Sequence, residues 1–181
     1  MQGFDRDRSP QPDCTLSVSI INYRTAQMTI DCVRSVLADF DGSAIAGHVV
    51  VVENGSGDGS AKVLSDWISR EGLAARVTLV VSPVNTGFSG GHNQGIAAHR
   101  AAFYLVLNSD ALLRPGFCAA ILAATAEDPQ AGLWAPRIDY DTGEQQISCY
   151  RVASPHSELI RGAQTGPVTK LLARHVVALE M

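Results

Sequence analysis

The sequence predicts an α/β fold in which a mainly parallel sheet carries helices on both faces. Between residues 15 and 127, four short apolar runs alternate with segments of helical periodicity. Strands that are joined by helices usually lie parallel, with right-handed connections and helices on both faces of the sheet. Beyond this region, two short segments flank a tight turn at residues 141–143. They predict an additional C-terminal antiparallel hairpin.

The first half of the alternation contains two strands and two helices. Residues 15–22 (TLSVSIIN) are β-branched and largely apolar, and residues 48–53 (HVVVVE) contain the four valines expected of a buried parallel strand. A turn rich in glycine and helix-capping residues, NGSGDGS at residues 54–60, follows the second strand. The helices are indicated by apolar stripes at Thr29, Val33, Val36, Leu37 and Phe40, and at Ala61, Leu64, Trp67 and Ile68.

The second half contains the remaining two strands. Residues 76–82 (RVTLVVS) predict the third strand, and residues 83–95 form a glycine-rich stretch that we expect to be irregular. A short helix at residues 96–102 then leads to YLVLNSD, residues 104–110. Because its apolar run is continuous, we expect this fourth strand to be buried on both faces. A last helix begins near Pro115-Gly116, with an inner face of Cys118, Ile121, Leu122 and Thr125.

These elements suggest three parts of the chain. Residues 1–13 are expected to be a flexible tail, and residues 14–152 a single domain. Residues 153–181 are expected to be a helical segment that starts an otherwise missing part of the protein. The helical stripe consists of Val168, Leu171, Leu172, His175, Val176 and Leu179.

Composition excludes several classes of protein. With 46% hydrophobic and 18% charged residues, the 181-residue chain is typical of an ordinary globular protein. A net charge of -4 argues against a nucleic-acid-binding surface. The four cysteines lack metal-ligand spacing, which favours reduced thiols and a cytoplasmic location. No apolar run approaches the roughly 18 residues of a membrane span, and the N-terminal residues do not resemble a signal peptide.

Polar side chains follow each of the four predicted strands. Because parallel strands end at the same edge of a sheet, these groups predict one polar cleft, where ligands bind in open α/β sheets. Asp110 has two interpretations, a ligand of a metal ion or sugar hydroxyl, or a cap of the following helix. The polar strand ends are Asn22 with Tyr23, Glu53 with Asn54, Asn85, and Asn108 with Asp110.

The glycines at positions 87, 90, 91 and 95 permit close approach of backbone to a ligand, with N–H groups available to a phosphate. Alternatively, they only shape a long connection. They do not form a dinucleotide fingerprint, which should follow the first strand directly. His92 and His99 are not part of a catalytic or metal constellation, so we interpret both as structural residues.

Four motifs in order carry a resemblance to a known family: SVSIINYR, VVVVENGSGDGS, VNTGFSGGHNQGI and YLVLNSDALLRPG. Together they resemble the family 2 glycosyltransferases, particularly the bacterial rhamnosyltransferase-like branch, over about residues 15–150. The resemblance implies the GT-A fold and inverting transfer of a sugar from a nucleotide-diphosphosugar donor. The implied partners are that donor and a saccharide or lipid-linked saccharide acceptor. The protein is expected to be cytoplasmic, or peripheral to the inner face of the membrane.

The resemblance also assigns residues by position. Glu53 matches the acid that contacts the nucleotide base, and Asp110 matches the ligand of a Mg²⁺ or Mn²⁺ ion. Asn108 replaces the first acid of the family's DxD motif, which leaves one anionic ligand fewer. The remaining matches to the nucleotide-sugar site are Asn22, Tyr23, Asn54, Gly87, Gly90, Asn93, Asn108 and Ser109.

The main departure of this sequence from the family is that it has no recognisable catalytic base. Inverting transfer needs a general base near the acceptor hydroxyl. In the family that this sequence resembles, the base is an acid from an acidic pair downstream of the hairpin. The residues after Tyr150 contain Glu158 and Glu180 but no such pair. We therefore expect a truncated form that holds the donor half, a partner chain that supplies the acceptor side, or loss of transfer. The last case leaves a non-catalytic nucleotide-sugar-binding or assembly module, with oligomerisation through the C-terminal helix.

Overall fold

The computed structural model describes residues 12–146, 149–150 and 178–179. The chain divides into two compact units, one up to Asp128 and one from Pro129 onward. The two units are described separately below.

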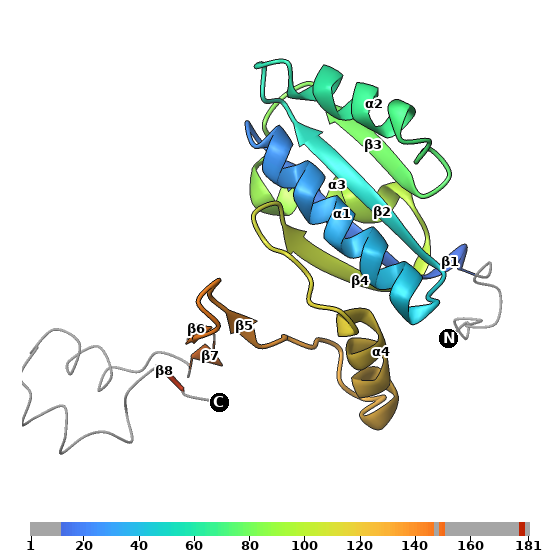
Figure 1. The fold of residues 1–181 in the computed structure, drawn as a ribbon, viewed down its shortest axis with the longest axis vertical. Helices are drawn as coiled ribbons and strands as arrows, with labels where there is room; N and C mark the ends of the chain where they lie inside the picture. The colour runs from blue at the N-terminus through green and yellow to red at the C-terminus, as the bar shows by residue number, and fades with distance from the viewer. Residues whose placement is uncertain (1–11, 147–148, 151–177, 180–181) are drawn as a thin grey trace, which may run out of the picture. The chain divides into compact units, whose positions relative to one another are not determined.

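The first unit is built on a four-stranded sheet with the order β3-β2-β1-β4. Its strands are β1 (Cys14–Asn22), β2 (Gly47–Asn54), β3 (Val77–Ser82) and β4 (Ala101–Asn108). All three neighbouring pairs run parallel. In Figure 1 the arrows of β2 and β4 point the same way. The predicted parallel α/β fold is confirmed.

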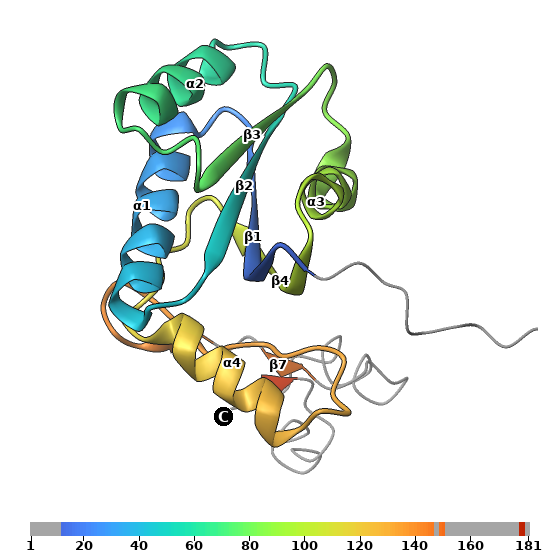
Figure 2. The same cartoon turned by 90° about the vertical axis from the view of Figure 1, so that its right-hand side faces the viewer.

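Helices cover both faces of this sheet. α1 (Ala26–Ser43) and α2 (Ser60–Arg70) lie on one face, and α3 (Gly87–Ala98) lies on the other, as Figure 2 shows. α4 (Phe117–Glu127) packs against α1. Between the sheet and the α1–α2 layer lies the main core, whose most buried side chains are no more than 2% exposed. This core includes Val18, Ile20, Val33, Val36, Phe40, Val49, Val51, Leu64 and Trp67.

The glycine-rich stretch differs from the prediction. It is irregular only over residues 83–86 and helical from Gly87 to Ala98. The predicted helix at residues 96–102 is therefore correct only as far as Ala98, and β4 already begins at Ala101. Glycine is unfavourable inside a helix, but here it allows α3 to lie close to the sheet. A Cβ at Gly91 would lie 2.7 Å from Cδ1 of Ile21, and one at Gly95 would lie 2.2 Å from Oγ of Ser19. Packing therefore overrides the local preference.

β4 is also different from the prediction of a strand buried on both faces. It is an edge strand of the described sheet, and Tyr104 and Val106 are 40% and 45% exposed. The physical reason is the position of α3, which packs on β1, β2 and β3. An apolar run predicts that a strand forms, but it does not predict how much of the strand a helix covers.

The second unit contains two short antiparallel pairs. β5 (Ile138–Asp139) pairs with β6 (Gln145–Gln146), which confirms a hairpin that is shorter than expected. The Gly143 N–H donates to the Tyr140 carbonyl oxygen over 2.9 Å and closes the turn. β7 (Cys149–Tyr150) pairs with β8 (Ala178–Leu179). Leu179 is thus in a strand rather than in the expected helix, whose other stripe residues lie outside the described part of the chain.

None of the helices in the described ranges combines the length and the apolar character needed to cross a lipid bilayer.

Candidate functional site

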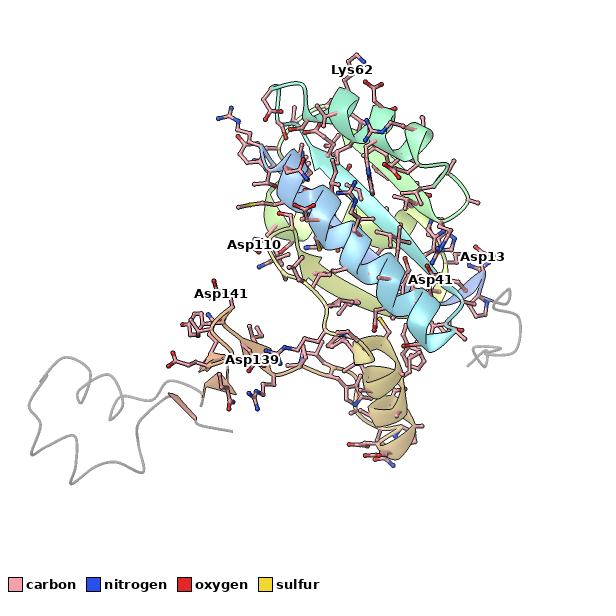
Figure 3. The ribbon with its side chains drawn as sticks, in the orientation of Figure 1. Asp13, Asp41, Lys62, Asp110, Asp139 and Asp141 are labelled. Carbon is pink, nitrogen blue, oxygen red and sulfur yellow. The ribbon has the colours of Figure 1, made fainter. Side chains whose placement is uncertain are left out.

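The strand register places the predicted polar ends at one edge of the sheet. Asn22 pairs with Glu53, and Asn108 pairs with Ile21, the residue directly before Asn22. Figure 3 shows Asp110 just beyond the end of β4, whereas Asp13 and Asp41 lie at the opposite edge. The carboxyl edge thus collects side chains from segments that are far apart in sequence.

Glu53 is the last residue but one of β2, and its carboxylate is buried, with the residue only 3% exposed. Its Oε1 atom accepts a 2.8 Å hydrogen bond from the backbone N–H of Ser56. Among the described residues, the other oxygen, Oε2, has no hydrogen-bond partner. Gly55, between them, adopts φ 70°, and a Cβ there would lie 2.4 Å from the Val84 carbonyl carbon. Glycine is therefore required for this turn.

Asn22 and Tyr23 follow each other at the end of β1 but have different surroundings. Asn22 is completely buried, and its Oδ1 accepts a hydrogen bond from the Thr29 hydroxyl over 3.1 Å. Its Nδ2 group donates to Oγ of Ser56 over 3.3 Å. Tyr23 is 40% exposed, and the Arg24 guanidinium carbon lies 5.2 Å from the centre of its ring. Tyr23 can therefore reach a ligand, whereas Asn22 supports the structure around it.

Asn54 organises the start of α3. It is buried, and its Oδ1 accepts hydrogen bonds from both the N–H and the hydroxyl of Thr86, at 3.0 and 2.9 Å. Its Nδ2 group donates to Asn85 Oδ1 and to the Gly87 carbonyl oxygen, both over 3.1 Å. These four bonds attach the N-terminus of α3 to the end of β2.

The predicted glycine-loop residues all lie on α3. Gly87 has φ 72° and open space around it, while a Cβ at Gly90 would lie 2.8 Å from Cβ of Thr86. Asn93 is exposed. His92 is only 4% exposed, its Nδ1 lies 2.9 Å from Oγ of Ser19, and burial lowers its pKa. These contacts fit the structural role expected for this histidine.

The fourth strand ends at Asn108, and Ser109 and Asp110 follow directly after it. Asn108 and Asp110 are exposed, and the Ser109 hydroxyl lies 3.2 Å from the hydroxyl of Thr25. Within the described part of the chain, Asp110 makes no hydrogen bond or ion pair. Burial, and secondly the charge of Asp110, raise the pKa of Cys32 to about 12. The Asp110 carboxylate is therefore available to a ligand.

Helix capping by Asp110 is excluded by the structure of the following segment. α4 begins only at Phe117, and its first N–H groups are bound by Asp39 from α1. The Asp39 carboxylate accepts from the N–H of Gly116 over 2.5 Å and from that of Cys118 over 2.7 Å. Burial alone would raise the pKa of Asp39, but these hydrogen bonds outweigh it and lower the pKa. The capping carboxylate is Asp39.

The described side chains could hold a metal ion only together with ligands from outside the protein. No group of three or more His, Cys, Asp or Glu side chains in the described ranges is arranged to hold a cation. However, Mg²⁺ commonly uses one or two protein carboxylates, with substrate phosphates and waters as its remaining ligands. The free carboxylate of Asp110, beside the exposed amide of Asn108, fits such a shared site.

Two residues that link the side chains of this site to one another, Ser56 and Arg24, were not identified as site residues from the sequence. Ser56 contacts Asn22, Arg24 and Glu53, and Arg24 adopts a left-handed backbone with φ 60°. Ser56 lies within the NGSGDGS turn, whose small polar residues were the available signal.

Comparison with known proteins identifies a family and solved structures that this chain is similar to. Residues 17–169 match the family described as Glycosyl transferase family 2. A search of curated proteins gave no significant match.

Two solved structures share the fold. One is a mannosyltransferase, PcManGT from Pyrobaculum calidifontis, in complex with GDP-Man and Mn²⁺ (TM-score 0.57, 21% identity), and it covers 69% of this chain. The other is TarS 1-349 from S. aureus (TM-score 0.52, 17% identity), which covers 74% of this chain. The chain spans only 38% and 43% of these two proteins, respectively.

Proposed function

Because the chain belongs to glycosyl transferase family 2, we propose that it binds a nucleotide-diphosphosugar at the carboxyl edge of its sheet, for inverting transfer of the sugar. In this proposal residues 14–152 form the donor-binding domain, and residues 153–181 begin the acceptor part. The Asn108-Ser109-Asp110 sequence favours the rhamnosyltransferase-like branch of the family.

The observation that carries the proposal is the presence at one sheet edge of two carboxylates that can still accept hydrogen bonds from a ligand. Oε2 of Glu53 and the carboxylate of Asp110 have no hydrogen-bond partner among the described residues. Glu53 would accept a hydrogen bond from an N–H of the base, next to the exposed ring of Tyr23. Asp110 lies at the end of β4, two strands away from β2, and would bind the diphosphate end.

Charge in the diphosphate must be balanced by local groups, since the protein has a net charge of -4. Asp110 would hold a Mg²⁺ or Mn²⁺ ion, which would neutralise the nucleoside diphosphate as it leaves. The N-terminus of α3, attached to β2 through Asn54, offers N–H groups and the positive end of the helix dipole. Both devices favour an anionic ligand without a broad basic surface.

Calorimetric titration tests this function. Purified protein is titrated with UDP-, dTDP- and GDP-sugars, each with Mn²⁺ and with EDTA. We expect saturable binding of one donor class that Mn²⁺ strengthens. A folded protein that binds none of the three classes contradicts the proposal.

The role of Asp110 is tested by Asp110→Asn, which preserves shape but removes the charge. We expect it to abolish the strengthening by Mn²⁺ while leaving the melting temperature nearly unchanged. Asp66→Asn is the matched control, because Asp66 is also an exposed acid but pairs with Lys62 on α2. If Asp110→Asn and Asp66→Asn bind alike, Asp110 does not hold the metal.

A further inference from the structure

We propose that Ser56 is the positioning residue for the nucleoside end of the donor. The inference rests on the proposed function and concerns a residue that does not itself need to touch the ligand. Ser56 is 3% exposed and is connected to every side chain assigned to this end: directly to Asn22 and Glu53, and through Arg24 to Tyr23.

The direct contacts orient the acid that would recognise the base. The Ser56 N–H donates to Oε1 of Glu53 and thereby fixes the orientation of the carboxylate, whose other oxygen, Oε2, has no partner among the described residues. The Ser56 hydroxyl oxygen accepts from Nδ2 of Asn22, whose other end is held by the Thr29 hydroxyl. The turn after β2 is thereby attached to the end of β1 by buried groups.

Arg24 provides the indirect contact. Its φ of 60° lies in the left-handed region, which residues with side chains seldom adopt unless the surrounding structure enforces it. Two bonds to Ser56 enforce it here. The Arg24 N–H donates to Oγ of Ser56 over 3.0 Å, and its Nε donates to the Ser56 carbonyl oxygen over 3.3 Å.

The conformation of Arg24 in turn determines what lies against Tyr23. The Arg24 guanidinium lies over one face of the tyrosine ring, which is 40% exposed. Because Nε of Arg24 is held by Ser56, the guanidinium is fixed over the ring. Tyr23 is thereby oriented before any ligand arrives, which lowers the entropy cost of binding.

The Ser56 hydroxyl is therefore expected to affect nucleoside binding independently of the metal. Ser56→Ala removes the acceptor for both the Arg24 N–H and the Asn22 amide, but keeps the backbone bond to Glu53. The variant also keeps the bond from Arg24 Nε to the backbone carbonyl oxygen of residue 56, but the Arg24 N–H loses its partner. The left-handed conformation of Arg24 is then enforced less strongly, so the guanidinium is held less firmly over the Tyr23 ring.

The first test measures binding of UMP, dTMP and GMP in EDTA, where no metal contributes. For the nucleotide that the wild-type protein binds, we expect Ser56→Ala to raise Kd about tenfold. Ser82→Ala is the matched control, because Ser82 is equally buried and its hydroxyl donates to the Val84 carbonyl oxygen. We expect it to change Kd by less than about twofold. Equal Kd values for the two variants overturn the inference.

The second test separates positioning from a general loss of stability. Arg24→Gly places at this position a residue that adopts φ 60° without strain. If Ser56 acts through Arg24, the double variant Ser56→Ala/Arg24→Gly should lose no more affinity than the weaker-binding single variant. Fold-losses that multiply in the double variant overturn the inference. Should Ser56→Ala not fold, Ser56→Cys replaces it in both tests, with a smaller loss expected.

Failure of the inference and failure of the proposed function give different results. If the wild-type protein binds no nucleotide or donor, the proposed function fails, and the inference fails with it. If the wild-type protein binds and Ser56→Ala binds equally well, only the inference fails.

Discussion

The backbone N–H of Ser56 donates a 2.8 Å hydrogen bond to Oε1 of Glu53, a carboxylate that is 3% exposed. A buried carboxylate is stable only when it is hydrogen-bonded, and Ser56 supplies this bond from within the turn that follows β2. The same bond distinguishes the two oxygens of Glu53, since Oε1 is bound to Ser56 and Oε2 has no partner among the described residues.

Glu53→Gln is expected to weaken nucleotide binding while preserving the fold. The glutamine carbonyl oxygen can take the place of Oε1 and keep the bond to Ser56. Its amide N–H group then lies where Oε2 was, so that a donor on the protein faces a donor on the base. We expect a loss of about 1–3 kcal/mol in binding free energy. Isothermal calorimetry with the preferred nucleotide measures the loss, and unchanged affinity would contradict a base contact at Glu53.

Asp39→Asn is expected to destabilise the first unit. Asp39 is 4% exposed and accepts N–H groups at the start of α4, and an asparagine can keep only one such acceptor. Hydrogen bonds to charged groups contribute about 1.5–3 kcal/mol, so we expect a loss of about 2 kcal/mol in the free energy of unfolding. Urea titration at pH 7 measures it, with Asp66→Asn as control. Equal stability of the two variants would refute the capping role.

Asp39 should also contribute to acid unfolding. Its pKa in the folded protein is lowered from 3.8, so its contribution to stability is complete above that value. The contribution is lost as the pH falls through the lowered pKa of the folded state. We expect Asp39→Asn to lose less stability than the wild-type protein over this acidic range. Parallel slopes of unfolding free energy against pH would argue against this linkage.

His48 should make stability depend on pH in a higher range. Burial, and then the neighbouring charge of His99, lower its pKa from 6.5 to about 4. Between these values the unfolded chain binds the proton more readily than the folded protein, so stability falls as the pH falls from 6.5 towards 4. His48→Gln does not titrate and can keep a hydrogen bond to Thr78, which lies 2.9 Å from Nε2 of His48. We expect a flatter dependence in this variant, measured by urea unfolding at pH 7.5 and 5. An unchanged dependence would show that His48 does not carry the effect.

Gly95→Ala should show how closely α3 packs on the sheet. An added Cβ would lie 2.2 Å from the Ser19 hydroxyl oxygen, so either α3 must shift or Ser19 must give up its bond to His92, at a cost of about 1–3 kcal/mol. Gly42→Ala is the matched control on α1, because its Cβ meets nothing within 4 Å and alanine is the better helix former. Thermal unfolding compares the two. If Gly95→Ala is as stable as Gly42→Ala, α3 does not require glycine here.

Much of the fold could be predicted because it depends on local patterns. The four valines of β2 and the stripe on α1 have the periodicity of a buried strand and of an amphipathic helix, whatever they pack against. The polar ends at Asn22, Glu53 and Asp110 could also be predicted, since parallel strands bring their carboxyl ends to one edge. Such features depend only on residues that are close together in the sequence.

The features that the sequence did not indicate depend on contacts between distant residues. The glycines of α3 form a helix because the sheet lies directly beneath them, and Tyr104 is exposed because α3 packs on the other three strands. The bond from Arg24 to Ser56 spans 32 residues, and the bond from Cys118 to Asp39 spans 79.

By itself, the sequence determined the order of strands and helices and the polar groups that follow each strand. Only the tertiary structure decided which of those groups form hydrogen bonds within the protein, as Asn22 and Asn54 do. It also decided which have no partner among the described residues, as is the case for Asp110. The physical reason is that a hydrogen bond needs both partners within about 3 Å. Local periodicity does not specify distances between segments, and the packed fold does.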